Sequence, residues 1–187
     1  MSPGVVNDDL FRVALDELGA VLAKVDEESI DAACRLIADA RTIGVYGCGR
    51  EALQIEGFAM RLFHLGLPVA VVGDVTMPAL GRDDVFLATS GPGEASTVLA
   101  LMRTATAAGA TNLLLTAEPE SSAGELADAV LVIPAQTMAG DRSTSVLPMG
   151  SAYEGALFVL FEVMVLKLGA LTGATEEAMR AKHTNME

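Results

Sequence analysis

A glutamate at the start of a long apolar segment is the residue in this sequence best suited to proton transfer. Glu154 follows Pro148-Met-Gly-Ser151 and falls in the first turn of a helix expected over residues 151–171. A carboxylate in that position can simply favour the helix dipole. In a cleft that excludes water, burial would raise its pKa toward neutrality, and Glu154 could then act as a general base. The local sequence leaves both interpretations open.

Two glycine-rich loops, each following a buried apolar run, can bind a polar or anionic ligand. The first is Gly47-Cys-Gly-Arg-Glu-Ala52, and the second is Ser90-Gly-Pro-Gly-Glu-Ala-Ser-Thr97. A helix is expected to begin in or after each loop, so exposed backbone N–H groups would point at a ligand near a helix N-terminus. Together the loops indicate a ligand with an anionic or polar head and a polyol body. The simpler alternatives are a tight strand-to-helix turn in the first loop and a helix cap at Ser96 in the second.

The first loop also matches the G-x-G-x-x-A pattern of dinucleotide-binding proteins, through Gly47, Gly49 and Ala52. Asp74 follows the next expected strand, where an acidic residue can bind a ribose. A dinucleotide-dependent oxidoreductase is therefore an alternative function, although the sequence offers no evident substrate domain.

The chain has two histidines, His64 and His183, far apart in the sequence. His64 ends an expected helix, where an imidazole can hydrogen-bond free carbonyl groups, so a structural role is expected. His183 lies in the C-terminal segment and, on local grounds alone, is a solvated surface residue. Neither HExxH nor CxxC spacing occurs, and we expect no metal and no cofactor.

Composition excludes several classes of function. The 187 residues carry a formal net charge of −13, which argues against a nucleic-acid partner because phosphates require a basic surface. Length and a hydrophobic content of 51% predict a single domain over residues 1–187. No signal peptide is recognisable, and Glu162 and Lys167 interrupt the longest apolar segment. The chain is expected to be cytoplasmic, with no membrane partner.

The elements that must position these residues follow from the hydrophobic periodicity. Helices are expected over 9–24, with Asn7 and Asp8 as caps, and over 28–40, 51–65, 96–108, 151–171 and 175–182. Strands are expected over 42–46, 68–72, 85–89, 111–116 and 130–133. This alternation predicts an α/β fold: a five-stranded parallel sheet flanked by helices, as in flavodoxin-like three-layer sandwiches. Ligands bind beyond the carboxyl ends of such strands, where the loops above and the long polar loop 134–147 would lie.

Several motifs occur in an order that resembles a known family. They are Gly47-x-Gly-Arg50, Phe58-Ala-Met-Arg-Leu-Phe-His-Leu-Gly66, Val71-Val-Gly-Asp74, Ser90-Gly-x-Gly-Glu94, Pro148-Met-Gly-Ser-x-Tyr-Glu154 and Lys182-His-Thr-Asn-Met-Glu187. Together, from about residue 25 to the C-terminus, they resemble the SIS (sugar isomerase) family and, within it, the 6-phospho-3-hexuloisomerases.

The resemblance implies a homotetramer that interconverts a 3-ketohexose 6-phosphate and fructose 6-phosphate through a cis-enediol, without a metal. It implies Glu154 as the proton-transfer base and His183, from a neighbouring subunit, as a residue that assists catalysis or orients the sugar. The substrate-binding residues that it implies are Gly47, Gly49, Arg50, Glu51, Ser90, Gly91, Gly93, Glu94, Ser96, Thr97 and Ser151. Because SIS domains also serve as sensors, a non-catalytic sugar-phosphate-binding module is a further alternative.

Three residues depart from the family's pattern. Its loops typically read Gly-Arg-Ser-Gly and Ser-Gly-Ser-Gly-Glu-Thr, and this chain has Glu51, Pro92 and Ala95 where hydroxyl groups normally bind the sugar phosphate. A carboxylate at a phosphate site adds repulsion, and Pro92 also removes a backbone donor. Ser96 and Thr97 can compensate if the loop is displaced by one residue. Glu51 could otherwise hydrogen-bond a hydroxyl of an unphosphorylated sugar, so the substrate is less well predicted than the scaffold.

Overall fold

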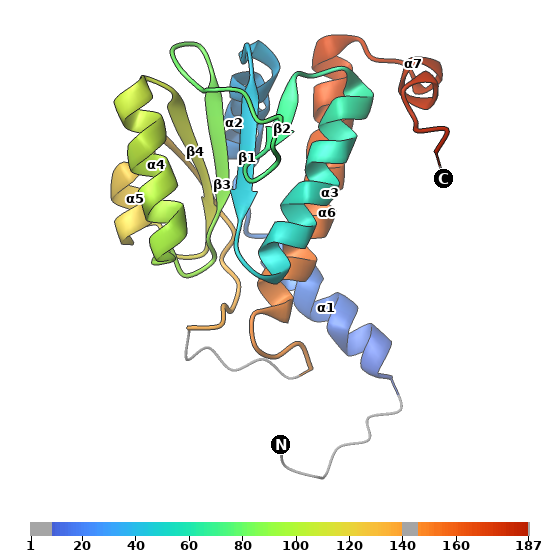
Figure 1. The fold of residues 1–187 in the computed structure, drawn as a ribbon. Coiled ribbons are helices and arrows are strands. Elements are labelled where there is room, and N and C mark those ends of the chain that lie inside the picture. Colours follow the sequence, from blue (N-terminus) through green and yellow to red (C-terminus); the bar gives the residue numbers. More distant parts are fainter. Residues whose placement is uncertain (1–8, 140–145, 187) are drawn as a thin grey trace.

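The computed structural model describes residues 9–139 and 146–186 and contains one parallel sheet between two layers of helices (Figure 1). The strands are β1 (Ile43–Gly47), β2 (Val69–Val71), β3 (Val85–Thr89), β4 (Thr111–Thr116) and β5 (Ala129–Val132). Their order is β2-β1-β3-β4-β5, the flavodoxin-like order, so the predicted fold class is confirmed. The strand order reverses between β1 and β3, which is where such sheets bind ligands.

The helices are α1 (Leu10–Leu22), α2 (Glu27–Asp39), α3 (Arg50–Leu65), α4 (Ser96–Ala108), α5 (Ser122–Leu126), α6 (Ser151–Thr172) and α7 (Glu176–Ala181). Helices α2, α3 and α6 cover one face of the sheet, and α4 and α5 cover the other (Figure 1). Two faces covered by helices explain why the strands are nearly continuous apolar runs rather than alternating ones. In β3, for example, Val85 and Leu87 pack in one core cluster and Phe86 and Ala88 in the other.

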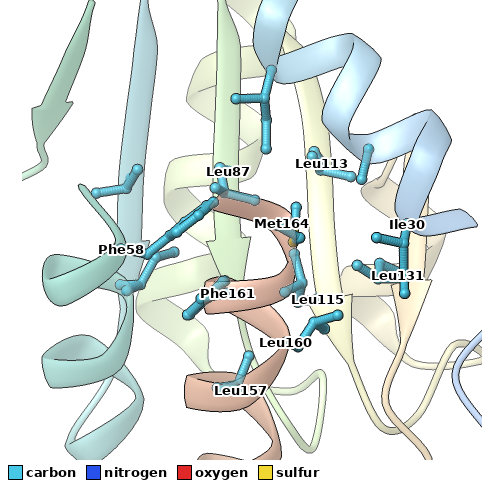
Figure 2. Packing of buried hydrophobic residues seen from close by; sticks show 14 of the residues in the cluster. Ile30, Phe58, Leu87, Leu113, Leu115, Leu131, Leu157, Leu160, Phe161 and Met164 are labelled. Atoms are coloured by element: carbon cyan, nitrogen blue, oxygen red, sulfur yellow. The ribbon is translucent and has the colours of Figure 1, made fainter. Parts of the chain in front are cut away.

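The larger core lies under α6, whose side chains meet those of α3 and the sheet (Figure 2). The rings of Phe58 and Phe161 stack with centroids 4.3 Å apart, and Met164 and Leu87 are fully buried beside them. Among the described residues, α6 is the one helix whose length and composition would allow it to cross a membrane. A core helix meets the same criterion, and α6 forms much of this core.

Some local predictions were wrong. Asp9 caps α1, because its Oδ1 accepts a hydrogen bond from the Arg12 N–H at 3.0 Å; Asn7 and Asp8 lie outside the described residues. Ser96 does not cap α4, because it is the first helical residue and Ala95 is the cap. Helix α5 was missed. The loop predicted over 134–147 is described only at 134–139 and 146–147.

Candidate active site

The candidate site lies where the carboxyl ends of β1 and β3 meet the first turns of α3 and α6, at the lower end of Figure 1. Gly47 and Thr89 are register partners in β1 and β3. A Cβ atom on Gly47 would lie 2.8 Å from the Thr89 methyl group, so only glycine allows this approach. Gly49 has φ +60° and ψ −131°, a conformation that favours glycine, and it turns the chain directly into α3.

Arg50 and Glu154 form an ion pair across the site. Arg50 Nη2 lies 2.9 Å from Glu154 Oε2, and Arg50 also donates to the Met149 carbonyl at 2.9 Å and to Ser151 Oγ at 3.3 Å. The Glu154 side chain is only 13% exposed, whereas that of Arg50 is 53% exposed. Burial raises the pKa of Glu154, and the charge and hydrogen bond of Arg50 partly oppose that rise. Such an environment suits a carboxylate that must take up and return a proton.

Glu51 turns from the first turn of α3 toward the second glycine-rich loop. Both of its carboxylate oxygens lie 3.1 Å from the Gly91 nitrogen, which donates to them, and Oε2 also accepts from the Thr89 hydroxyl at 2.9 Å. Burial raises the pKa of Glu51; the bonds from Gly91 and Thr89 oppose this rise, and the nearby Glu154 carboxylate adds to it. Thr89 Oγ1 lies 3.1 Å from the hydroxyl of the buried Tyr153. Glu51 therefore ties the two loops together.

The second loop leaves one buried hydroxyl group available. Ser90 is 2% exposed, and its Oγ has no hydrogen-bond partner in the described part of the chain. Gly91 beside it is tightly enclosed, since a Cβ atom there would meet Thr137, Glu51 and Tyr153 at 3.0 to 3.2 Å. A ligand hydroxyl or anion that reached Ser90 would supply the missing partner.

Other predicted residues lie apart from this cluster. Glu94 accepts hydrogen bonds from the Ser122 N–H at 2.8 Å and from its hydroxyl at 2.7 Å, which lower the pKa of Glu94 and hold it at the start of α5. Gly93, with φ +72°, packs against Ser121. Ser96 and Thr97 form the first turn of α4, which has no side-chain cap.

His183 directly follows the C-cap of α7, which lies beyond the C-terminal end of α6 (Figure 1), whereas Glu154 lies in the first turn of α6. Its ring stacks on that of His64 with centroids 5.4 Å apart, and its Nδ1 lies 3.1 Å from the Thr184 carbonyl. Helix α6 has 22 residues and is therefore about 33 Å long. Within one chain His183 is thus remote from Glu154, and the predicted action across a subunit boundary is not tested by a single chain. His64 is buried, as a structural role requires.

Thr89 and Tyr153, which connect Glu51 to α6, were not predicted from the sequence. Thr89 ends an otherwise apolar strand, and Tyr153 directly precedes Glu154. A hydroxyl group at the end of a buried strand was the signal available for Thr89. Asp74 lies in a turn in which its carbonyl accepts from the Met77 N–H at 3.0 Å. Within residues 9–139 and 146–186, no group of acidic, histidine or cysteine side chains is arranged to hold a metal ion.

Comparisons with known proteins identify the family of this chain. The SIS domain model matches residues 36–160. The chain is 37% identical to a 3-hexulose-6-phosphate isomerase from Mycobacterium gastri, over 98% of this chain and 94% of the relative. It is 31% identical to the enzyme of that name from Bacillus subtilis, over 92% and 95% of the two chains.

A solved structure with the same fold is a hypothetical protein from Methanococcus jannaschii, for which 3-hexulose-6-phosphate isomerase function was inferred. The two structures superpose with a TM-score of 0.83 at 23% identity, over 95% of this chain and 98% of that one. At that identity the likeness supports the fold alone. The family model and the two curated relatives carry the assignment further: this chain belongs to the SIS domain family.

Proposed function

We propose that this chain is a sugar isomerase that moves a carbonyl group between neighbouring carbons of a ketohexose, as in the interconversion of 3-hexulose 6-phosphate and fructose 6-phosphate. The observation that carries this proposal is Glu154, a largely buried carboxylate with a raised pKa that faces Arg50 at the carboxyl ends of the strands. Two relatives named 3-hexulose-6-phosphate isomerase match this chain over nearly their whole length.

The proposed reaction needs one base and a stabilised oxygen. Glu154 removes the proton from C2 of a 3-ketose, and the C3 carbonyl oxygen is protonated, so that a cis-enediol forms. The C2 hydroxyl group then loses its proton to become a carbonyl, and Glu154 returns a proton to C3. Arg50 and the hydroxyl groups of Ser90 and Ser151 can stabilise the developing negative charge on oxygen. No atom is gained or lost in this sequence.

Deuterium exchange tests the base. Carbon-bound hydrogen of fructose 6-phosphate and of free fructose is followed in heavy water with the wild type and with Glu154→Gln. We expect the variant to lose the exchange by a factor of about 10² to 10⁴. Glu162→Gln, on the same helix but paired with Arg61, is the matched control and should exchange like the wild type. Undiminished exchange in Glu154→Gln would remove Glu154 as the base.

The proposal includes a cytoplasmic homotetramer in which residues 1–187 form a single domain and His183 completes a neighbour's site by moving protons between the two sugar oxygens. Large apolar side chains on α1, α3 and α6 are exposed in the single chain and support self-association. They include Phe11, Leu53, Phe63, Phe158 and Leu166.

Mixing two inactive variants tests this shared site. Glu154→Gln and His183→Ala should each be nearly inactive alone, but hybrids regain sites that combine an intact Glu154 with a neighbour's intact His183. Activity should therefore return after the two are unfolded and refolded together. Each variant refolded alone is the control, and failure of the mixture to exceed it would refute the shared site.

A second candidate function is a sugar-binding module without catalysis. Arg50 favours it, because its guanidinium engages the Glu154 carboxylate that a base would need free to take a proton from a sugar carbon. Such a module would gain thermal stability from fructose 6-phosphate without any isotope exchange. A dinucleotide-dependent oxidoreductase is not proposed, because the SIS domain model covers residues 36–160, which include the Gly47-x-Gly49-x-x-Ala52 pattern on which that alternative rested.

A further inference from the structure

The hydrogen-bond donors at the end of β3 are already occupied by an acid of the same chain. The Gly91 N–H and the Thr89 hydroxyl both donate to the Glu51 carboxylate, at 3.1 and 2.9 Å. A loop that offers a backbone N–H and a hydroxyl group at one point is suited to binding an anion. Here Glu51 is that anion, and it is a fixed part of the protein.

The cation of the site is occupied as well. Arg50 is paired with Glu154 and also donates to Met149 and Ser151. The other acid of the second loop, Glu94, is bound to Ser122. Among the described side chains of this part of the site, Arg50 therefore contributes one positive charge, and Glu51 and Glu154 contribute two acids. A phosphate at this point would bring further negative charge without a free cation to receive it.

The crowding around Gly91 also argues against a phosphate at this point. The Glu51 carboxylate lies 3.2 Å from the position that a Cβ atom of Gly91 would take, and the ring of Tyr153 lies equally close to that position. A phosphate could reach the Gly91 N–H only if Glu51 left it. A sugar hydroxyl needs no such displacement, because it can donate to a Glu51 oxygen while Gly91 and Thr89 keep their hydrogen bonds to that carboxylate.

We infer that Glu51 is a specificity-determining residue, which makes this part of the site accept an uncharged, hydroxyl-bearing portion of a sugar and exclude a phosphate group from the Gly91 and Thr89 donors. This inference rests on the proposed function, since it concerns which ketose that isomerase takes. The substrate class that follows is a ketose that has no phosphate on the portion that reaches Glu51, Gly91 and Thr89.

Calorimetric titration of two matched ligands tests the inference. Free fructose and fructose 6-phosphate are titrated into the wild type, Glu51→Gln, Glu51→Ser and the control Glu56→Gln, which changes an exposed acid on the same helix. The readout is the ratio of the affinity for fructose 6-phosphate to the affinity for fructose. We expect this ratio to rise by about tenfold or more in Glu51→Gln and Glu51→Ser, and to stay unchanged in Glu56→Gln. Glu51→Gln keeps the side-chain shape, so it remains informative if the serine variant folds poorly.

A ratio that is unchanged or lower in the Glu51 variants would overturn the inference, as would a lack of binding of both ligands by the wild type and by Glu51→Gln. The titration requires no turnover, so it is independent of the isomerase proposal. If the ratio rises but no variant or wild type exchanges deuterium with either sugar, the isomerase fails and the role of Glu51 stands. If the wild type exchanges deuterium but the ratio does not rise, the isomerase stands and the role of Glu51 fails.

Discussion

Two arginine–glutamate pairs join α3 to α6, and they differ in where they lie and in how far the acid is buried. Arg50 and Glu154 pair at the strand ends, where the glutamate side chain is 13% exposed. Arg61 and Glu162 pair further along the same two helices, with Nη2 and Oε2 3.3 Å apart and a glutamate that is 44% exposed. Similar chemistry therefore occurs in two settings on one helix interface.

The difference between the two pairs shows that the position of a glutamate in the fold, and not its residue type alone, determines its pKa. An exposed ion pair contributes about 0 to 1 kcal/mol to stability and little else. At Glu154 burial raises the carboxyl pKa, and Arg50 restrains that rise. A proton-transfer carboxylate needs a raised pKa, since one with an ordinary pKa is a weak base, but it must also remain ionised near neutral pH, which Arg50 favours. The first turn of α6, directly beyond the sheet, is what gives Glu154 this property.

Replacing each arginine in turn is the strongest test of the difference between the Arg50–Glu154 and Arg61–Glu162 pairs. In Arg50→Met nothing opposes burial, so the pKa of Glu154 should rise further, and less of the base is ionised near neutral pH. The acid limb of kcat/KM against pH should move to higher pH, and kcat/KM on that limb should fall by about tenfold or more. The measurement is the pH profile of the isomerase reaction. Arg61→Met is the control and should leave the limb in place; equal movement in both variants would contradict the role given to Arg50.

Two glycines, one in the site and one on α3 between the two arginines, differ in how much space surrounds them. An alanine Cβ at Gly91 would crowd Thr137, Glu51 and Tyr153, so Gly91→Ala should lower the free energy of unfolding by about 1 to 3 kcal/mol. It should also slow the isotope exchange, because Glu51 must move. Gly57, on α3 between the two arginines, has no such neighbour within 4 Å, and Gly57→Ala should add about 0.5 to 1 kcal/mol.

Chemical denaturation of both glycine variants measures whether the free energy of unfolding falls in Gly91→Ala and rises in Gly57→Ala. The exchange assay measures the activity of the same variants. A Gly91→Ala protein that is as stable and as active as the wild type would show that the packing around Glu51 is looser than the structure indicates.

The fold could be predicted because hydrophobic periodicity reports burial directly. Strands over 85–89 and 111–116 and the helix over 96–108 have the bounds expected from the sequence. Helix α5 was missed because its five residues are too few to show a helical period, although Ser121 caps it by accepting from the Gly124 N–H. Ser96 was mistaken for a cap because a hydroxyl group at a helix start is suitable either just outside the first turn or inside it.

The site was only partly predictable, because the direction of a side chain depends on tertiary neighbours. Glu51 and Glu94 occupy similar glycine-rich loops in the sequence, yet Glu51 turns to Gly91 and Glu94 turns to Ser122. Nothing local to either loop distinguishes these two destinations. The position of His183 relative to a site depends on a second chain, which a sequence motif cannot place.

The two loop glutamates also supply the smallest expected effect, a difference of sign in the pH dependence of stability. Burial raises the folded pKa of Glu51 above its usual value near 4.5, so its ionised form costs stability at neutral pH, and that cost disappears as pH falls below the folded pKa. The hydrogen bonds from Ser122 lower the folded pKa of Glu94, so its ionised form adds stability that is lost as pH falls.

Glutamine substitution at Glu51 and at Glu94 should change the pH dependence of the free energy of unfolding in opposite directions. As pH rises from about 4 to 7, the stability of Glu51→Gln should increase relative to the wild type, by at most about 1.4 kcal/mol per pH unit for one proton. The stability of Glu94→Gln should decrease relative to the wild type as pH rises from about 3 to 5, because the folded pKa of Glu94 is lowered from its usual value. Urea denaturation at several pH values measures both differences. If the two differences ran in the same direction, burial would not be what distinguishes the Glu51 carboxyl from the Glu94 carboxyl.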